Sequence, residues 1–193
     1  IGTGGQATCQ LQAMLEVLSL EMIYVFSRNP ANAESFCREQ IESAGECRLV
    51  PASSRKFLSD CGLITTATGS RSPVFTDDEI RTGVHINGIG SFGPDMAEVP
   101  TETVCRATVV LDHREAALCE AGDIVGPMTR GRLPADYAPA ELGEVLLSKR
   151  PGRTSPEETT FFKSVGNAAQ DIVCAREILA IAERDSLGQV VHL

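Results

Sequence analysis

The residues with the clearest chemical meaning stand at the start of the chain, where a glycine-rich turn runs into a helical pattern. Gly2, Gly4 and Ala7 have the spacing G-x-G-x-x-A, and apolar residues follow at helical intervals from Leu11 to Leu18. In such turns the first glycine allows a tight turn, the second admits a pyrophosphate, and the small third residue lets the helix pack closely. The N-terminus of that helix attracts the phosphates. The pattern predicts a dinucleotide-binding turn, with a purely structural turn or a methyltransferase-like loop as the alternative.

A turn of this kind is normally delivered by a β-strand, and only Ile1 stands before it here. We therefore expect the chain to be part of a longer polypeptide, in which an N-terminal segment supplies that strand. Residues needed for catalysis are expected in the same segment.

A second position with chemical meaning lies about 20 residues after the glycines, where NAD-selective folds place an acidic residue against the ribose hydroxyls. The apolar run 22–26 ends here in Ser27, Arg28 and Asn29 instead. An arginine with small polar neighbours accommodates a 2′-phosphate, which a carboxylate would repel. The sequence favours NADPH, with NADH possible; the alternative is that Arg28 is a solvated loop residue.

Two later loops follow expected strands and are rich in small residues. Thr66 and Ala67 belong to the segment 65–69, which either lets a ribose or nicotinamide approach or forms a tight turn. The segment 85–94 contains several glycines, and such an open backbone suits a flat nicotinamide ring. His85 is a candidate proton donor there, although a histidine inside an apolar strand is more often packed and hydrogen-bonded.

The remaining ionisable residues give weaker signals. We expect the acidic residues near the loops, Glu98, Glu120 and Asp123, to be caps or salt-bridge partners. The three histidines are isolated from one another, which gives no support for a metal site.

The elements that must position these residues alternate between strand and helix, which is typical of a doubly wound parallel sheet of the Rossmann type. Strands are expected at 22–26, 47–50, 63–67, 84–87 and 108–112, and helices at 31–43 and 54–58. We assign residues 1–125 to this NADP-binding domain. The proline-rich segment 126–156 is predicted to be a connection with a short helical patch at 140–147.

The last part, residues 157–193, is predicted to be a long helix that returns to a second domain for substrate binding and dimerisation. Its apolar stripe is made of Phe161, Val165, Ala168, Ala169, Ile172, Val173, Ala175 and Leu179. Gly188 is a plausible stop signal, and residues 190–191 are expected to add a short strand.

Composition limits the partners. The net charge of −9 argues against nucleic acid, which requires clustered basic residues. No apolar run reaches the length of a membrane span. The seven cysteines have neither metal-ligand nor C-x-x-C spacing, which indicates reduced thiols and a cytoplasmic location.

Taken together, several motifs make the chain similar to the ornithine cyclodeaminase and mu-crystallin family over essentially its whole length. They are Ile1 to Ala7, Ser27-Arg28-Asn29, residues 64–68, residues 85–90, Glu120-Ala121-Gly122-Asp123 and Phe162-Lys163-Ser164-Val165-Gly166. The resemblance implies a Rossmann domain, a second domain and a homodimer.

The resemblance also implies roles for individual residues. Cofactor-binding positions would be Gly2, Gly4, Gly5, Gln6, Ala7, Ser27, Arg28, Asn29, Thr66, Ala67, Ile86, Asn87, Gly88, Ile89 and Ser164, with Val165 touching the substrate. The substrate-carboxylate arginine and the active-site lysine are expected outside this chain.

One departure helps to choose between activities in that family. Members similar to true cyclodeaminases carry a proton-transferring aspartate where this chain has Phe92, whereas the pattern from Ser91 to Asp95 looks like that of the imine reductases. Asp95 itself is expected to be a turn or cap residue. We therefore expect NADPH-dependent reduction of a small cyclic imino acid. The alternatives are an ornithine cyclodeaminase and a mu-crystallin-like protein that binds NADPH without turnover.

Overall fold

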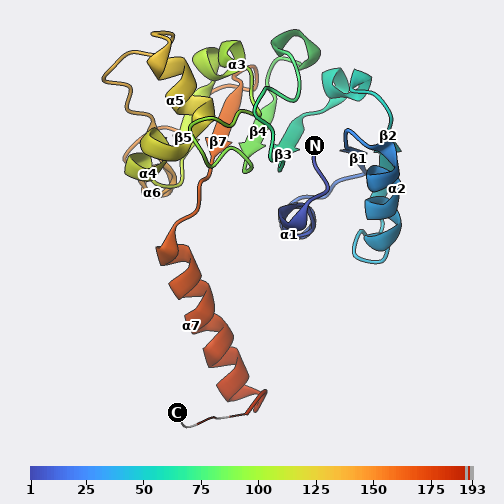
Figure 1. Cartoon of the computed structure of the whole chain (residues 1–193). Coiled ribbons are helices and arrows are strands. Elements are labelled where there is room, and N and C mark those ends of the chain that lie inside the picture. The colour runs from blue at the N-terminus through green and yellow to red at the C-terminus, as the bar shows by residue number, and fades with distance from the viewer. Residues whose placement is uncertain (190, 192–193) are drawn as a thin grey trace.

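The chain folds around parallel β-strands, as seen in a computed structural model that describes residues 1–189 and 191 (Figure 1). A five-stranded sheet has the order β3-β4-β7-β5-β6 and is parallel throughout. Its strands are β3 (Leu63–Thr66), β4 (His85–Gly88), β5 (Thr108–Leu111), β6 (Ala140–Glu141) and β7 (Thr160–Lys163). A separate pair of parallel strands is formed by β1 (Met22–Phe26) and β2 (Arg48–Ala52).

Helices and short 3-10 turns connect the strands. They are α1 (Gly5–Val17), α2 (Pro30–Glu39), η1 (Lys56–Asp60), η2 (Asp77–Glu79), α3 (Thr101–Arg106), α4 (Arg114–Glu120), α5 (Gly122–Thr129), α6 (Leu142–Leu146) and α7 (Ala168–Arg184). The predicted α/β class with a parallel, Rossmann-like sheet is confirmed. The strands predicted between residues 22 and 112 all form within a few residues of their expected bounds.

Residues 1 and 2 lie between the two groups of strands and join them. The nitrogen of Ile1 donates to the Thr65 carbonyl (2.7 Å), the Ala67 amide donates to the Ile1 carbonyl (2.9 Å), and the Gly2 amide donates to the Phe26 carbonyl (2.9 Å). This is the pattern of a strand that ends between β1 and β3. The chain goes to one side of this position through α1, β1, α2 and β2, and to the other side through β3, so it is the point at which the strand order reverses.

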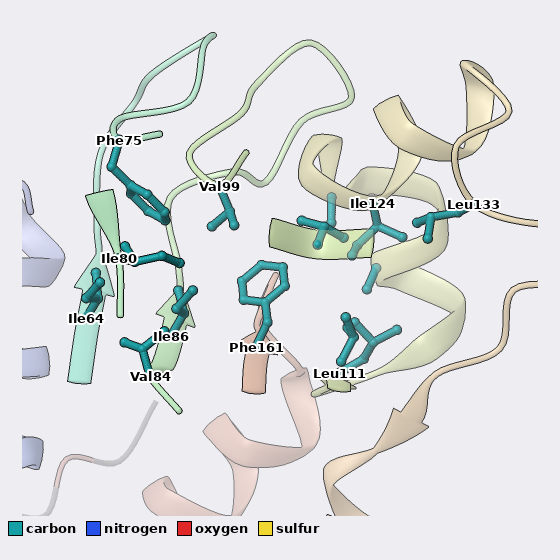
Figure 2. Packing of buried hydrophobic residues seen from close by; sticks show 14 of the residues in the cluster. Ile64, Phe75, Ile80, Val84, Ile86, Val99, Leu111, Ile124, Leu133 and Phe161 are labelled. Atoms are coloured by element: carbon teal, nitrogen blue, oxygen red, sulfur yellow. The ribbon is translucent and has the colours of Figure 1, made fainter. Parts of the chain in front are cut away.

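The main core lies between the five-stranded sheet and the helices α3, α4 and α5. Phe161 of β7 is fully buried at its centre, with Ile86 on one side and Leu111 and Ile124 on the other (Figure 2). A second, smaller cluster packs α1 and α2 against β1, through residues such as Ala7, Leu11, Val25 and Phe36. Ala7 is the third small residue of the glycine turn, and its burial fits the predicted close packing of helix on strand.

The prediction that Phe161 begins the long C-terminal helix is wrong. Residues 160–163 form β7, which pairs with β4 on one side and with β5 on the other. The sheet therefore continues past residue 125, where the sequence placed the end of the nucleotide-binding domain, and runs to Lys163. The predicted connection at 126–156 likewise contributes the end of α5, the edge strand β6 and α6.

Helix α7 stands away from the sheet (Figure 1). Its predicted apolar residues Ile172, Val173 and Leu179 are more than half exposed, as is Ile178, and no residue of the helix is buried. The strand predicted at 190–191 falls partly outside the described residues. In the part of the chain that the structure describes, none of the helices combines the length and apolar character that crossing a membrane requires. None of the seven cysteines, all at described positions, is paired.

Candidate functional site

A crevice of about 370 Å³ opens at the carboxyl ends of β1 and β3, beside the glycine turn. Three segments far apart in sequence line it: residues 1–4, residues 26–28 after β1, and residues 67–70 after β3. The structure thus brings together residues that the sequence analysis singled out separately. In open parallel sheets this point, where the strand order reverses, is where nucleotides bind.

The glycine turn has the geometry that its sequence predicts. Gly2 has φ +102°, and a Cβ there would lie 2.3 Å from the Ala67 carbonyl oxygen, so only glycine fits. Among the described residues, no atom would instead lie within 4 Å of a Cβ on Gly4 or Gly5. Within the described part of the chain, no side chain caps α1 at Gly4. An uncapped helix N-terminus that faces open space can accept an anionic group, so the turn fits the pyrophosphate of a dinucleotide.

The residues after β1 have different roles in the structure. Ser27 and Arg28 line the crevice, and Arg28 is exposed. Asn29 is the N-cap of α2, where its side-chain oxygen accepts from the Ala31 amide (3.2 Å). Its predicted contact with a cofactor would therefore have to coexist with this capping bond.

Arg55 lines the crevice beside Arg28 and was not predicted as a site residue. Its guanidinium donates to Glu79 (3.1 Å) and to the Val74 carbonyl (3.2 Å). The only signal in the sequence is a polar run after a short strand, which is common on loops.

The inner side of the site is held by Glu98, which is fully buried. One carboxylate oxygen accepts from the Thr68 amide (2.6 Å), and the other accepts from the Gly90 amide (2.7 Å) and the Thr66 hydroxyl (2.9 Å). Glu98 therefore ties the loop after β3 to the loop after β4. The sequence predicted a cap or an ion pair at Glu98; it satisfies backbone donors as a cap does, but on two loops at once. Thr66, predicted to contact the cofactor, is itself fully buried.

A second buried carboxylate supports the first. One oxygen of Asp123 accepts from the amides of Glu98 (2.7 Å) and Val99 (3.0 Å). Its other oxygen is buried and has no hydrogen-bond partner among the described residues. Burial raises the pKa of Asp123 to about 6; Glu98 adds to this rise, and Lys163 opposes it. Glu120, the other acidic residue singled out here, is exposed.

Lys163 is fully buried at the end of β7 and was not predicted as a site residue on its own chemistry. Its ammonium group donates to the Gly88 carbonyl (3.1 Å). Burial lowers the pKa of Lys163, while the nearby charges of Asp123, Glu98 and Asp112 raise it in opposition. A lysine inside the sheet is expected only where carboxylates balance its charge.

The residues predicted on β4 have their side chains mostly within the protein. Ile86 is fully buried in the main core. Asn87 lies within hydrogen-bond distance of His85 Nε2 (3.1 Å) and donates to the Thr65 hydroxyl (3.5 Å). Gly88 and Ile89 stand at the end of the strand, where their backbone is closest to the carboxyl edge of the sheet.

His85 lies at the opposite end of β4 from that edge and is within hydrogen-bond distance of Thr160 (2.7 Å). Burial lowers its pKa. The structure therefore supports a packed, hydrogen-bonded histidine and not a proton donor at the crevice.

Ser164 and Val165 follow β7 directly and are half-buried. The Ser164 amide donates to the Gly88 carbonyl (3.1 Å), so the loop after β7 lies against the end of β4. On the loop after β4, Phe92 is 61% exposed. Asp95, predicted to be a turn or cap residue, pairs with Arg71 at the surface (3.3 Å).

Comparison with known proteins places this geometry in a family. The chain matches the model of the ornithine cyclodeaminase/mu-crystallin family over residues 1–185. It is 36% identical over 193 residues to a Δ1-pyrroline-2-carboxylate reductase of Bacillus cereus, covering 100% of this chain and 59% of the relative.

Two solved structures are similar as well. The Thermococcus litoralis Δ1-pyrroline-2-carboxylate reductase in complex with NADH and L-proline superposes with a TM-score of 0.91 at 36% identity, covering 98% of this chain and 59% of that one. An archaeal alanine dehydrogenase dimer with bound NAD gives 0.89 at 28% identity, covering 100% and 59%. The chain thus spans somewhat more than half the length of these relatives. With a family match across nearly all of its residues, the chain belongs to the ornithine cyclodeaminase/mu-crystallin family.

Proposed function

We propose that this chain is the nucleotide-binding part of a reductase that converts a small cyclic imino acid, such as Δ1-pyrroline-2-carboxylate, into the corresponding amino acid. The observation that carries the proposal is the crevice in which the glycine turn, the Ser27–Arg28 loop and the loop after β3 converge. The 36% identity to a reductase of this substrate supports the choice of reaction.

Residues of the crevice and of the helix and strand ends beside it would together hold a nicotinamide nucleotide. The uncapped start of α1, at Gly4, Gly5 and Gln6, would hold the pyrophosphate. Gly88, Ile89 and Ser164, at the ends of β4 and β7, would face the nicotinamide ring. When such a cofactor is bound it supplies the hydride, and the protein orients it.

We further propose that NADPH is preferred to NADH. Arg28 is exposed at the crevice, and no carboxylate is among the residues that line it. A guanidinium in this place can form paired hydrogen bonds with a 2′-phosphate. Arg55 adds a second positive charge to the same wall, although Glu79 partly offsets it.

The competing activity in this family, cyclodeamination of ornithine, is disfavoured by Phe92. At the position where the resemblance places an acid-base aspartate, this chain presents an exposed phenyl ring that cannot transfer a proton. The neighbouring carboxylate, Asp95, is paired with Arg71 at the surface.

A homodimer and a cytoplasmic location complete the proposal. The exposed apolar residues of α7 support an assembly that covers them, because a stripe of this kind on a long helix is normally buried. A similar structure is described as a dimer. The unpaired cysteines support a reducing compartment.

The direct test follows NADPH absorbance after mixing the purified protein with Δ1-pyrroline-2-carboxylate. We expect NADPH to be consumed in proportion to the imine. Ammonia release from ornithine with no net change in NADPH would instead identify a cyclodeaminase. Saturable NADPH binding with no product from either compound would leave a binding protein.

A further inference from the structure

Asp112 is a buried carboxylate at the carboxyl end of β5 that the proposed reaction leaves without a role. We infer that Asp112 is a positioning residue: it fixes the loop 164–166 and makes the Ser164 hydroxyl oxygen a hydrogen-bond acceptor for the carboxamide of a bound nicotinamide. This inference rests on the function proposed above and assigns to Asp112 the orientation of the reactive ring.

The contacts of Asp112 concentrate on one short loop. A single oxygen, Oδ2, accepts from the Ser164 hydroxyl (2.8 Å), the Val165 amide (2.9 Å) and the Gly166 amide (2.8 Å). The other oxygen accepts from the amide of His113 (2.8 Å). The backbone of Asp112 also continues the strand ladder, since its amide donates to the Lys163 carbonyl (3.1 Å). The carboxylate thus joins the end of β5 to the first turn after β7.

This arrangement decides the direction of hydrogen bonding at Ser164. A serine hydroxyl has one proton to donate and two lone pairs that can accept. Because a carboxylate is a strong acceptor and has no proton of its own, the Ser164 proton is committed to Asp112. The hydroxyl oxygen can then only accept from a ligand.

The position of Ser164 indicates which group of a bound cofactor its hydroxyl oxygen would accept from. Its amide donates to the Gly88 carbonyl, so it stands beside the end of β4, at the carboxyl edge where ligands of parallel sheets bind. The nicotinamide group carries a single kind of N–H donor, the carboxamide. An acceptor fixed at this edge would hold the carboxamide in one orientation and thereby set which face of the ring is presented to the substrate.

The inference predicts ligand-selective effects of two substitutions. In Asp112→Asn the NH₂ group must face either the His113 amide or the three donors of the loop 164–166, so the loop is held less firmly; Ser164→Ala removes the hydroxyl but leaves Asp112 to hold the amides of Val165 and Gly166. Affinities are measured by calorimetric titration with NADPH and with 2′-phospho-ADP-ribose, which lacks the nicotinamide. We expect each variant to bind NADPH about 5- to 10-fold more weakly and 2′-phospho-ADP-ribose unchanged. The double variant should bind NADPH no more weakly than Asp112→Asn.

Asp77→Asn is the matched control. Asp77 is also a carboxylate with side-chain partners, Thr103 (2.6 Å) and Arg106 (2.9 Å), but it does not line the crevice. Its loss should lower stability without changing the ratio of the two affinities.

Equal losses of affinity for NADPH and 2′-phospho-ADP-ribose, or additive losses in the double variant, would overturn the role of Asp112. They would not overturn the proposed function. Failure of the unaltered protein to bind either ligand would overturn the proposed function together with this inference. If Asp112→Asn does not fold, Ser164→Ala decides, because full NADPH affinity in that variant contradicts the inference.

Discussion

The two walls of the crevice are built differently. On the side of β3, β4 and β7, the loops are held from within by the buried carboxylates Glu98, Asp123 and Asp112, with Lys163 as a buried cation beside them. On the side of β1 and β2, the loop after β1 carries the exposed residues Arg28 and Asn29, and Arg55 is bound at the rim. We call the first the fixed wall, because internal hydrogen bonds hold it. The second is the exposed wall, because its charged side chains face the solvent.

The hydrophobic clusters beneath the two walls also differ, in their size. The five-stranded sheet has a large cluster centred on Phe161, while α1, α2 and β1 share a small one that includes Ala7 and Leu11. Hydride transfer depends on positions within fractions of an ångström, whereas attraction of a phosphate needs mainly a charge. The fixed wall is therefore suited to position the cofactor, and the exposed wall is suited to select between cofactors.

Glu98→Gln should give the largest effect, because it breaks the bond between the loops of the fixed wall. Glutamine has the same shape, but its NH₂ group must face a backbone amide that now has no acceptor, and the attraction for Lys163 is lost. We expect the free energy of unfolding to fall by about 4 kcal/mol, measured by urea denaturation.

Asp95→Asn controls for this substitution, because it removes a carboxylate from a surface ion pair on the same loop as Glu98. It should leave the urea midpoint unchanged, as exposed pairs add little. A loss in Glu98→Gln as small as in Asp95→Asn would mean that the buried network does not hold the wall.

Asp123 should make the fixed wall sensitive to pH. Its pKa rises from 3.8 to about 6 on folding, so between these values the folded state binds more protons than the unfolded state. Stability from this group therefore falls as pH rises from about 4 to 6, by up to about 3 kcal/mol, and changes no further above that. Carboxylates with lowered pKa, such as Glu79 and Glu158, act in the opposite sense and at lower pH.

The measurement compares the unfolding free energy of the unaltered protein with that of Asp123→Asn across this pH range. The variant should gain stability relative to the unaltered protein as pH rises from 4 to 6. The charged groups that face Asp123 are Glu98 and Lys163, and both remain in the variant. A constant difference between the two proteins would show that Asp123 does not titrate in this window.

The two walls were also unequally predictable from sequence. The glycine turn and the Ser27–Arg28 loop depend on local spacing, and the structure brings them together as that spacing requires. The fixed wall depends on contacts between distant residues: Glu98 reaches Thr66 and Gly90, and Asp112 reaches Ser164. A lone acidic residue in a loop carries no local mark of such partners.

Phe161 illustrates the same limit for secondary structure. Together with Val165 and Ala168 it fits a helical spacing, yet the short segment 160–163 inserts between β4 and β5 as the central strand. A run of four residues gives too few periods to separate a strand from the start of a helix. What decides the outcome is burial on both faces, which only the completed sheet supplies.

Arg28→Ala should give the smallest effect and the most selective one, because it alters only charge on the exposed wall. Loss of the guanidinium should weaken NADPH binding by about tenfold, equivalent to ~1.4 kcal/mol, and change NADH binding little. Arg38→Ala is the control: Arg38 is an exposed arginine of α2, outside the crevice, whose guanidinium donates to Ser35. Stability should be unchanged in both variants. If Arg28→Ala keeps its preference for NADPH, the proposed role of Arg28 in cofactor selectivity is wrong. If Arg28→Ala lowers the stability as well, Arg28 also helps to hold the fold together. The exposed wall would then not be independent of the fixed one, and the distinction between the two walls would be wrong.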